Sequence, residues 1–309
     1  MTTSEKTFRG YTEEQGQTYA QNRLDYHPSL YNRIITHHTT TGGHLDTIID
    51  VGCGPGIAIS NLSKYFNHAI GLDPSQGMIT AARSVHADKL TRTGEPIRFE
   101  VSTAEDLGSR LADPIPDASV DMIVAATAAH WFDMPAFWKA AARVLKPNGS
   151  IAIWASGYVR VHPSMTAAAE LQATMDRMSE EYLEPYFHAG NLMTRDLYRG
   201  LVLPWTADPA IPGFVEGTFL RKDLDIGEDF YAGGHPEVDL GTFEKMIGTM
   251  SPVTRWREAN PEAVGTEKDV VRIFRREFER ILRDAGVEAG RERVKGFVHG
   301  FYLVVKREA

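Results

Sequence analysis

The sequence predicts an α/β fold with a parallel, doubly wound sheet, because short apolar strands alternate with amphipathic helices between residues 45 and 155. The first strand, 45–51 (LDTIIDV), is almost continuously apolar and rich in β-branched residues, as expected for a strand buried on both faces. It ends in a glycine-rich turn at 52–56. Sheets of this kind bind ligands at the carboxyl ends of their strands.

The other elements of this region follow in order. A helix comes after the glycine turn, and Ser75 is placed to cap a second helix after the second strand. A third helix is expected to close in the turn residues 146–149 (KPNG). The further strands are expected at 68–72, 97–101, 119–125 and 151–154, and the third helix at 134–145.

The second half of the chain is less regular. Apolar residues at helical spacing predict helices at 164–182, 239–250 and 266–285. An apolar run predicts a final strand at 298–305. We expect the region 156–309 to cap and complete the same sheet rather than to form a separate domain.

Composition argues against several classes of function. The 309 residues are 42% hydrophobic, and 33 Lys and Arg against 41 Asp and Glu give a net charge of −8, which disfavours non-specific binding to nucleic acid. We expect no secretion signal and no membrane span, since no apolar run approaches the ~18 residues that a span needs. Cys53 is the single cysteine, so an intrachain disulfide and a Cys-rich metal site are excluded. A reduced, cytoplasmic location is expected, with no metal, and a homodimer stays open.

The glycine turn is compatible with three kinds of nucleotide site. A phosphate-binding loop needs Lys-Ser/Thr after its glycines, but Ile57 and Ala58 stand there. A dinucleotide loop needs a small residue at position 57. The segment 50–56 (DVGCGPG) instead has glycines at every second position after an acid. Asp73 closes the second strand 17 residues after Gly56, where it can accept hydrogen bonds from a ribose diol.

With this loop and acid, residues 45–155 resemble the class I S-adenosylmethionine-dependent methyltransferases. DVGCGPG matches the first motif of that family and Asp73 its second acid; 102–107 stands where its adenine-contacting loop follows the third strand. Residues 116–121 and 145–149 resemble the segments before its fourth and fifth strands. The resemblance implies a Rossmann-like methyltransferase fold, with an antiparallel last strand and a helical cap, and S-adenosylmethionine as cofactor.

Residues 19–28 (YAQNRLDYHP) resemble a segment of trans-aconitate methyltransferase-like proteins and their fungal relatives. In those proteins a Tyr and an Arg close over the cofactor, which implies that residues 1–44 form a lid and that Tyr19 and Arg23 contact the cofactor's carboxylate. Residues 250–256 and 260–261 resemble the C-terminal segment of the same family more loosely.

These resemblances assign site residues. The glycine loop would make room for the amino-acid end of the cofactor, Asp73 would anchor its ribose, and Glu105 would read its adenine. Met78 either packs on the adenine or belongs to the helix core. The cofactor-binding residues expected in this way are Tyr19, Arg23, Asp50, Gly52, Cys53, Gly54, Asp73, Pro74, Met78, Ala104, Glu105 and Ala126.

The family resemblance also implies an acceptor, namely a carboxylate of a small di- or tricarboxylic acid such as trans-aconitate. A carboxylate has a pKa near 4, so it needs alignment with the methyl donor rather than a base. A chain with a charge of −8 must supply local cations for such an acid, and Arg195 is one candidate. The expected catalytic residues are His130 and Trp131, and the expected substrate-binding residues are Tyr26, His130, Trp154, Arg199 and Arg255.

Several alternatives remain at the level of the sequence. His130 and Trp131 could be structural, and each arginine could be a surface charge. A natural-product methyltransferase that acts on a phenol, enol or carbon centre would use His130 as a base. A cofactor-binding regulator without catalysis is a second alternative. An NAD-dependent dehydrogenase is disfavoured by Ile57.

Overall fold

The computed structural model describes residues 12–22 and 24–309. The chain divides into two compact units. The first combines the described part of Met1–Ser156 with Asp196–Ala232 and Gly300–Ala309, and the second combines Gly157–Arg195 with Gly233–His299.

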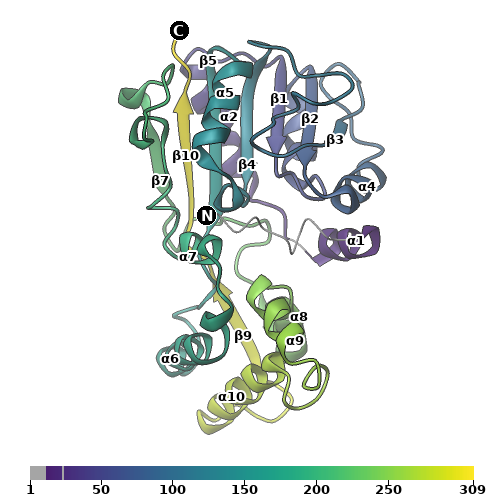
Figure 1. The fold of residues 1–309 in the computed structure, drawn as a ribbon. Coiled ribbons are helices and arrows are strands. Elements are labelled where there is room, and N and C mark those ends of the chain that lie inside the picture. Colours follow the sequence, from purple (N-terminus) through teal and green to yellow (C-terminus); the bar gives the residue numbers. More distant parts are fainter. Residues whose placement is uncertain (1–11, 23) are drawn as a thin grey trace. The chain divides into compact units, whose positions relative to one another are not determined.

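A seven-stranded sheet forms the centre of the first unit (Figure 1). Its strand order is β3-β2-β1-β4-β5-β10-β7. The first five strands in that order are parallel, whereas β10 is antiparallel to both β5 and β7. The strands are β1 (Thr47–Val51), β2 (His68–Asp73), β3 (Arg98–Val101), β4 (Val120–Ala126), β5 (Leu145–Ser156), β7 (Leu220–Asp223) and β10 (Gly300–Lys306). The prediction of a mostly parallel sheet with an antiparallel last strand is confirmed.

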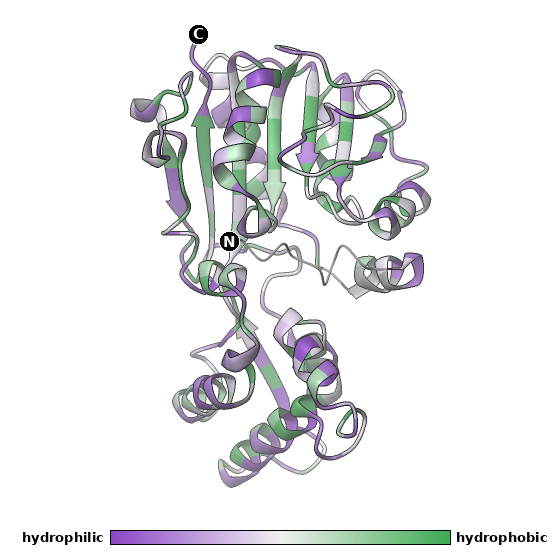
Figure 2. Ribbon diagram, in the orientation of Figure 1, coloured by the Kyte–Doolittle hydropathy of each residue, from purple (hydrophilic) through white to green (hydrophobic). Residues whose placement is uncertain are grey.

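Helices flank the sheet, so the side chains of its central strands are buried and are mostly apolar. Side chains of β1, β4 and β5 such as Ile48, Ile123 and Ile153 are fully buried, and Figure 2 shows hydrophobic residues concentrated along these strands. The helices of this unit are α1 (Glu13–Asn22), α2 (Pro28–Thr40), α3 (Ile57–Leu62), α4 (Gln76–Val85) and α5 (Met134–Val144). The predicted cap of α4 is present, since the Ser75 hydroxyl accepts from the Met78 N–H at 3.3 Å.

The second unit has a three-stranded sheet and a hydrophobic core of its own. The strand order is β6-β9-β8, and the core includes Leu171, Phe243, Val253 and Phe278. Its strands are β6 (Arg160–Val161), β8 (Glu237–Asp239) and β9 (Arg293–Phe297). Its helices are α6 (Ala168–Met178), α7 (Ala189–Arg195), α8 (Leu240–Gly248), α9 (Ser251–Ala259) and α10 (Val270–Asp284).

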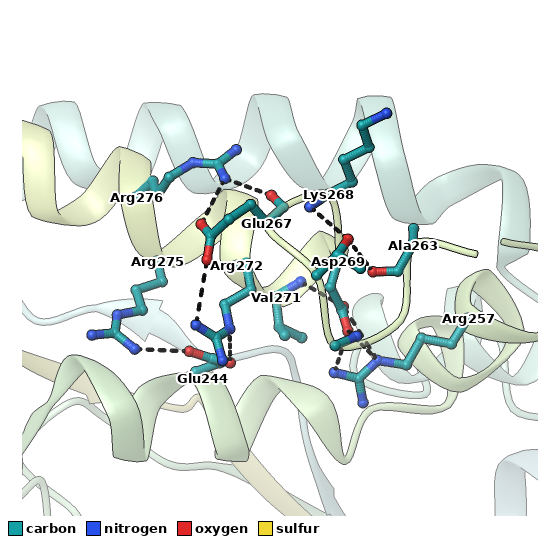
Figure 3. A network of polar contacts seen from close by, with 12 residues as sticks. Glu244, Arg257, Ala263, Glu267, Lys268, Asp269, Val271, Arg272, Arg275 and Arg276 are labelled. Atoms are coloured by element: carbon teal, nitrogen blue, oxygen red, sulfur yellow. Dashed lines mark hydrogen bonds and ion pairs between the residues drawn. The ribbon is translucent and has the colours of Figure 1, made fainter. Parts of the chain in front are cut away.

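A polar network joins three helices of this unit (Figure 3). The buried carboxylate of Asp269 caps α10 by accepting from the Val271 N–H at 3.3 Å, and it pairs with Arg257 of α9 at 3.0 Å. Glu244 of α8 pairs with Arg272 of α10 at 2.7 Å. The two ion pairs each join α10 to another helix, so they fix the packing of α10 against α8 and α9.

The structure differs from the sequence-based expectation in several boundaries. Residues 146–149 lie within β5 rather than in a separate turn, although Asn148 keeps a left-handed φ of 61°. The helix expected at 164–182 begins at Ala168 and changes to a π-helical turn at Ser179. The final strand, expected at 298–305, is β10 at Gly300–Lys306; the separate strand β9 ends before it, and the chain passes from the second unit to the first after His299.

Candidate functional site

The glycine loop after β1 has a backbone that side chains rarely permit. Gly52 and Gly54 have φ of 66° and 53°. A Cβ on Gly52 would lie 2.7 Å from the Cβ of Ala128, so the loop packs closely against the segment after β4. A Cβ on Gly54 would meet no heavy atom within 4 Å. The loop therefore leaves open space over Gly54 in which a ligand can approach the backbone.

Asp73 at the end of β2 fixes this loop. One carboxylate oxygen accepts from the Gly54 N–H at 2.9 Å, and the other accepts from the Ser75 N–H at 2.8 Å. The side chain is buried. Asp73 thus joins the loop after β1 to the start of α4, a role that the sequence did not indicate.

Asp50 is the acid that precedes the glycines. Its side chain is fully buried, and no described residue makes a well-formed hydrogen bond to either carboxylate oxygen, although the Ile59 backbone N–H lies near it. Burial raises the pKa of Asp50 well above its usual range; the Ile59 backbone N–H opposes this rise and the Asp73 carboxylate adds to it. A buried carboxylate without a well-formed hydrogen bond is costly, so this position fits a ligand that brings a cation or donors.

The other residues expected at the cofactor lie around the same loops. Glu105 accepts from the Asp133 N–H at 3.0 Å and so connects the loop after β3 to the start of α5. Burial, together with the Asp50 and Asp73 carboxylates, raises the pKa of the Cys53 thiol well above its usual range. Met78 and Ala104 are buried, and Pro74 and Ala126 are half-buried. Arg23 lies outside the described residues, as does the side chain of Tyr19.

His130 follows β4 in a 3₁₀ turn that spans Ala129–Trp131. Its Nδ1 is hydrogen-bonded to the hydroxyl of Tyr198, and its backbone N–H approaches the same hydroxyl at 3.4 Å. The His130 and Trp131 rings lie 4.5 Å apart between centroids. The two expected catalytic residues are therefore neighbours, and a tyrosine that the sequence analysis did not single out holds one of them.

Tyr26 and Trp154 also meet near the carboxyl end of β4. The Tyr26 and Thr127 hydroxyls are hydrogen-bonded at 3.0 Å, and the Thr127 N–H donates to the Trp154 carbonyl at 2.7 Å. The Tyr26 and Trp154 rings make an edge contact at 5.7 Å. Thr127 has a φ of 53°, which is strained for a β-branched residue. A strained backbone residue therefore lies three positions before His130.

Each expected substrate arginine has a partner within the protein. Arg199, in the first unit, donates to Asp223 at 2.9 Å and has a side chain that is 62% exposed. In the second unit, Arg195 pairs with Glu184 at 3.3 Å. Arg255 of the same unit donates to the Tyr186 carbonyl at 2.7 Å and to the Asn191 side chain at 2.6 Å. These contacts give the arginines structural roles beside any role toward a substrate.

In the part of the chain that the structure describes, no group of three or more His, Cys, Asp or Glu side chains is arranged to hold a metal ion. No helix among these residues combines the length and the hydrophobicity that crossing a membrane requires.

Comparison with known proteins identifies the family. A family model described as a methyltransferase domain matches residues 49–153. A protein of Saccharomyces cerevisiae, described as a probable S-adenosylmethionine-dependent methyltransferase, is 33% identical over 281 residues, which cover 85% of this chain and 86% of the yeast protein. The chain belongs to the S-adenosylmethionine-dependent methyltransferases. The expected cofactor is therefore confirmed, and the open glycine loop and the Asp50 carboxylate fit it.

Other relatives of this methyltransferase match over different lengths. A Dictyostelium discoideum protein, provisionally described as a methyltransferase, is 34% identical over 145 residues, which is 47% of this chain and 48% of that protein. A structure from Anaeromyxobacter dehalogenans, provisionally described as a type II methyltransferase, has a TM-score of 0.57 at 24% identity. It covers 93% of this chain and 97% of its own, and it supports the fold alone.

Proposed function

We propose that this methyltransferase acts on a carboxylate oxygen of a small di- or tricarboxylic acid such as trans-aconitate. The observation that carries the proposal is the hydrogen bond between Tyr198 and Nδ1 of His130. It holds the imidazole in one orientation at the carboxyl end of β4, where ligands bind in such sheets. A fixed imidazole suits the alignment of an acceptor that is already ionised.

S-adenosylmethionine supplies an activated methyl group on a sulfonium. The residues proposed to hold it are those of the loops after β1, β2 and β3. The open backbone at Gly54 admits it, and the buried Asp50 offers a carboxylate to its cationic end. Asp73 keeps the loop in place and is proposed to bind the ribose, while Glu105 and Met78 are proposed to contact the adenine. The lid of residues 1–44 is part of the same proposal.

The acceptor site is proposed at His130, with Trp131, Tyr26 and Trp154 around it. A carboxylate has a pKa near 4, so His130 has no proton to remove and serves to orient the acid. Alignment of reacting groups supplies roughly 7–11 kcal/mol in favourable cases. The exposed guanidinium of Arg199 contacts Asp223 through Nη2, which leaves further N–H groups of the same side chain for an acid. Arg255 is proposed for the same role.

A substrate screen tests this proposal. Purified protein is incubated with S-adenosylmethionine and with small dicarboxylic, tricarboxylic and aromatic acids, and release of S-adenosylhomocysteine is measured. We expect turnover with a polycarboxylic acid and a rate that stays flat down to roughly pH 5–6, since the acceptor is ionised there. Turnover with phenols alone would contradict the proposal.

The second candidate is methyl transfer to a phenol, enol or carbon centre with His130 as base. The same hydrogen bond favours it if the Nδ1–H donates to Tyr198, because Nε2 would then carry a lone pair. Its rate would fall as a group with a pKa near 6.5 becomes protonated. A regulator without catalysis would bind the cofactor and release no S-adenosylhomocysteine with any acceptor.

A further inference from the structure

The segment before β7 brings an unusual backbone next to the site. Leu197 and Tyr198 are consecutive and have φ of 53° and 56°, in the left-handed region that residues other than glycine seldom occupy. Such residues cost on the order of 1–3 kcal/mol each and persist only where the surroundings hold them. Backbone strain of this kind gathers at functional sites.

Contacts from two strands hold this segment. Arg221 of β7 donates to the Leu197 carbonyl at 2.7 Å, and its guanidinium lies 4.5 Å from the centre of the Phe301 ring. The Phe301 ring is in turn 5.1 Å from the Tyr198 ring in an edge contact. Only 1% of Tyr198 is exposed. These contacts therefore fix the Tyr198 side chain, with its hydroxyl hydrogen-bonded to His130.

We propose that Tyr198 is a positioning residue that sets the tautomer of His130. Its hydroxyl donates to Nδ1, so the proton of the neutral imidazole stays on Nε2. His130 then presents an N–H donor toward the acceptor instead of a lone pair. The assignment of the acceptor as a carboxylate rests on the proposed function, whereas the tautomer does not.

The chemistry of the two groups sets the direction of this bond. A phenol is a good donor with a pKa near 10, and a neutral imidazole nitrogen is a good acceptor whose conjugate acid has a pKa near 6.5. The reverse bond would join a weaker donor to a weaker acceptor. The His130 backbone N–H also approaches the phenol oxygen, at 3.4 Å, from the acceptor side. Because the phenol oxygen accepts this N–H, its own O–H is left to donate to Nδ1.

In this tautomer, the two oxygens of a carboxylate acceptor would have different roles. An Nε2–H can hold the carboxylate oxygen that is not methylated, and the other oxygen remains free to attack the methyl group. An imidazole in this state cannot accept a proton at Nε2, so it cannot activate a phenol there. The tyrosine would thus select the class of acceptor as well as orient it.

The decisive experiment is a long-range ¹H–¹⁵N correlation spectrum of the ¹⁵N-labelled protein near pH 7.5. His130→Gln identifies the His130 signals by their loss. We expect Nδ1 to resonate as an unprotonated nitrogen and Nε2 as a protonated one in the wild type. In Tyr198→Phe this pattern is expected to change toward a mixture of tautomers. A proton on Nδ1 in the wild type, or an unchanged pattern in Tyr198→Phe, would overturn the inference.

A matched control and a kinetic readout complete the test. Tyr65→Phe removes a hydroxyl that donates to Asn32 at 3.2 Å, and it is expected to leave the His130 signals unchanged. Tyr198→Phe should raise KM for the acid about two- to tenfold, the effect of one hydrogen bond, with cofactor affinity unchanged. If the tautomer is as proposed but no carboxylic acid turns over, the inference stands and the proposed function fails.

Discussion

Asp73 acts on the proposed cofactor site through the backbone. Its two carboxylate oxygens accept from Gly54 and Ser75, and hydrogen bonds to an ionised acceptor are among the stronger ones in proteins. A residue expected to contact a ribose therefore also determines the shape of the loop that is proposed to receive the cofactor.

Replacement of this carboxylate should weaken the cofactor complex. We expect Asp73→Ala to lower the affinity for S-adenosylmethionine by about 1.5–3 kcal/mol, the range for hydrogen bonds to a charged group. Calorimetric titration measures the change. Asp113→Ala is the control, since that side chain is 87% exposed. Wild-type affinity in a folded Asp73→Ala variant would remove Asp73 from the cofactor site.

His130 is expected to contribute by position. His130→Gln should lower kcat about 10- to 100-fold and retain measurable turnover, because a carboxylate acceptor needs no base and loses an oriented donor. Cofactor affinity should stay the same. Steady-state kinetics from pH 5 to 8 measure this. Complete loss of turnover, combined with a wild-type rate that depends on a group titrating near pH 6.5, would favour the phenol or enol acceptor.

Single residues of the site differ in how far the sequence could reveal them. Asp50, Gly54 and Asp73 stand at fixed spacing around one strand-helix-strand unit, so a local pattern was enough to predict them as candidates. Tyr198 comes from an irregular segment 68 residues after His130, and no local pattern connects the two. Only the folding of that segment against β7 and β10 brings them together.

At the scale of one loop, Gly54 offers a test of cofactor access. Gly54→Val adds a branched side chain in the open space over the loop, at a φ of 53°, and should abolish S-adenosylmethionine binding. Gly94→Val is the matched control, since Gly94 also has a left-handed φ of 87° and open space around it, in the turn before β3. Both variants carry backbone strain, but only the first should lose binding by titration. Binding of S-adenosylmethionine by Gly54→Val with wild-type affinity would place the cofactor elsewhere.

At the polar network of the second unit, we expect the loss of Asp269 to lower the free energy of unfolding. Burial opposes ionisation of Asp269, but the Gly265 N–H, Arg257 and the Val271 N–H together lower its pKa. Asp269→Ala removes a helix cap and leaves Arg257 unpaired, so we expect a loss of about 2–4 kcal/mol in the free energy of unfolding. Because the folded pKa is lowered, this contribution is present above pH 4 and declines as the pH falls below it.

Denaturant unfolding followed by circular dichroism measures this loss, with Glu288→Gln as a control at an exposed ion pair. Unchanged stability in Asp269→Ala would show that the network contributes little.

Helices such as α10 were predictable because one apolar stripe of residues repeats along them. The ends were not, because caps such as Asp269 depend on partners from α9 and the preceding loop.

The whole sheet was partly predictable from the sequence. The alternation that builds β1 to β5 is local, and it correctly indicated parallel strands; the ligand site at their carboxyl ends stays a prediction. The pairing of β10 between β5 and β7 joins segments such as Trp154 and Tyr302, which are far apart in the sequence. A periodic pattern predicts that a segment is a strand, but it does not predict which strands pair with it. For the same reason, the sequence could not show that 157–195 and 233–299 share a core.

One buried polar chain links distant parts of the first unit and makes its stability depend on pH. The fully buried His38 of α2 is hydrogen-bonded to Ser150 of β5 at 2.7 Å, and Lys306 of β10 donates to the same hydroxyl at 3.0 Å. Burial lowers the pKa of Lys306 to about 8. Burial also lowers the pKa of His38 to about 4; the His44 carbonyl opposes this shift and the Lys306 charge adds to it.

The sign of the resulting pH dependence follows from these values. Between the ordinary pKa of 6.5 and about 4, the unfolded chain binds a proton at His38 that the folded chain does not. Acidification through this range should therefore destabilise the fold, by on the order of 3 kcal/mol from this group. His38→Gln can still bond to Ser150 but does not titrate, so its free energy of unfolding should fall less steeply between pH 6.5 and 4. His68→Gln, at a half-exposed ring, is the control. Denaturant titrations at several pH values give these slopes, and a wild-type slope in His38→Gln would show that His38 is not the group responsible.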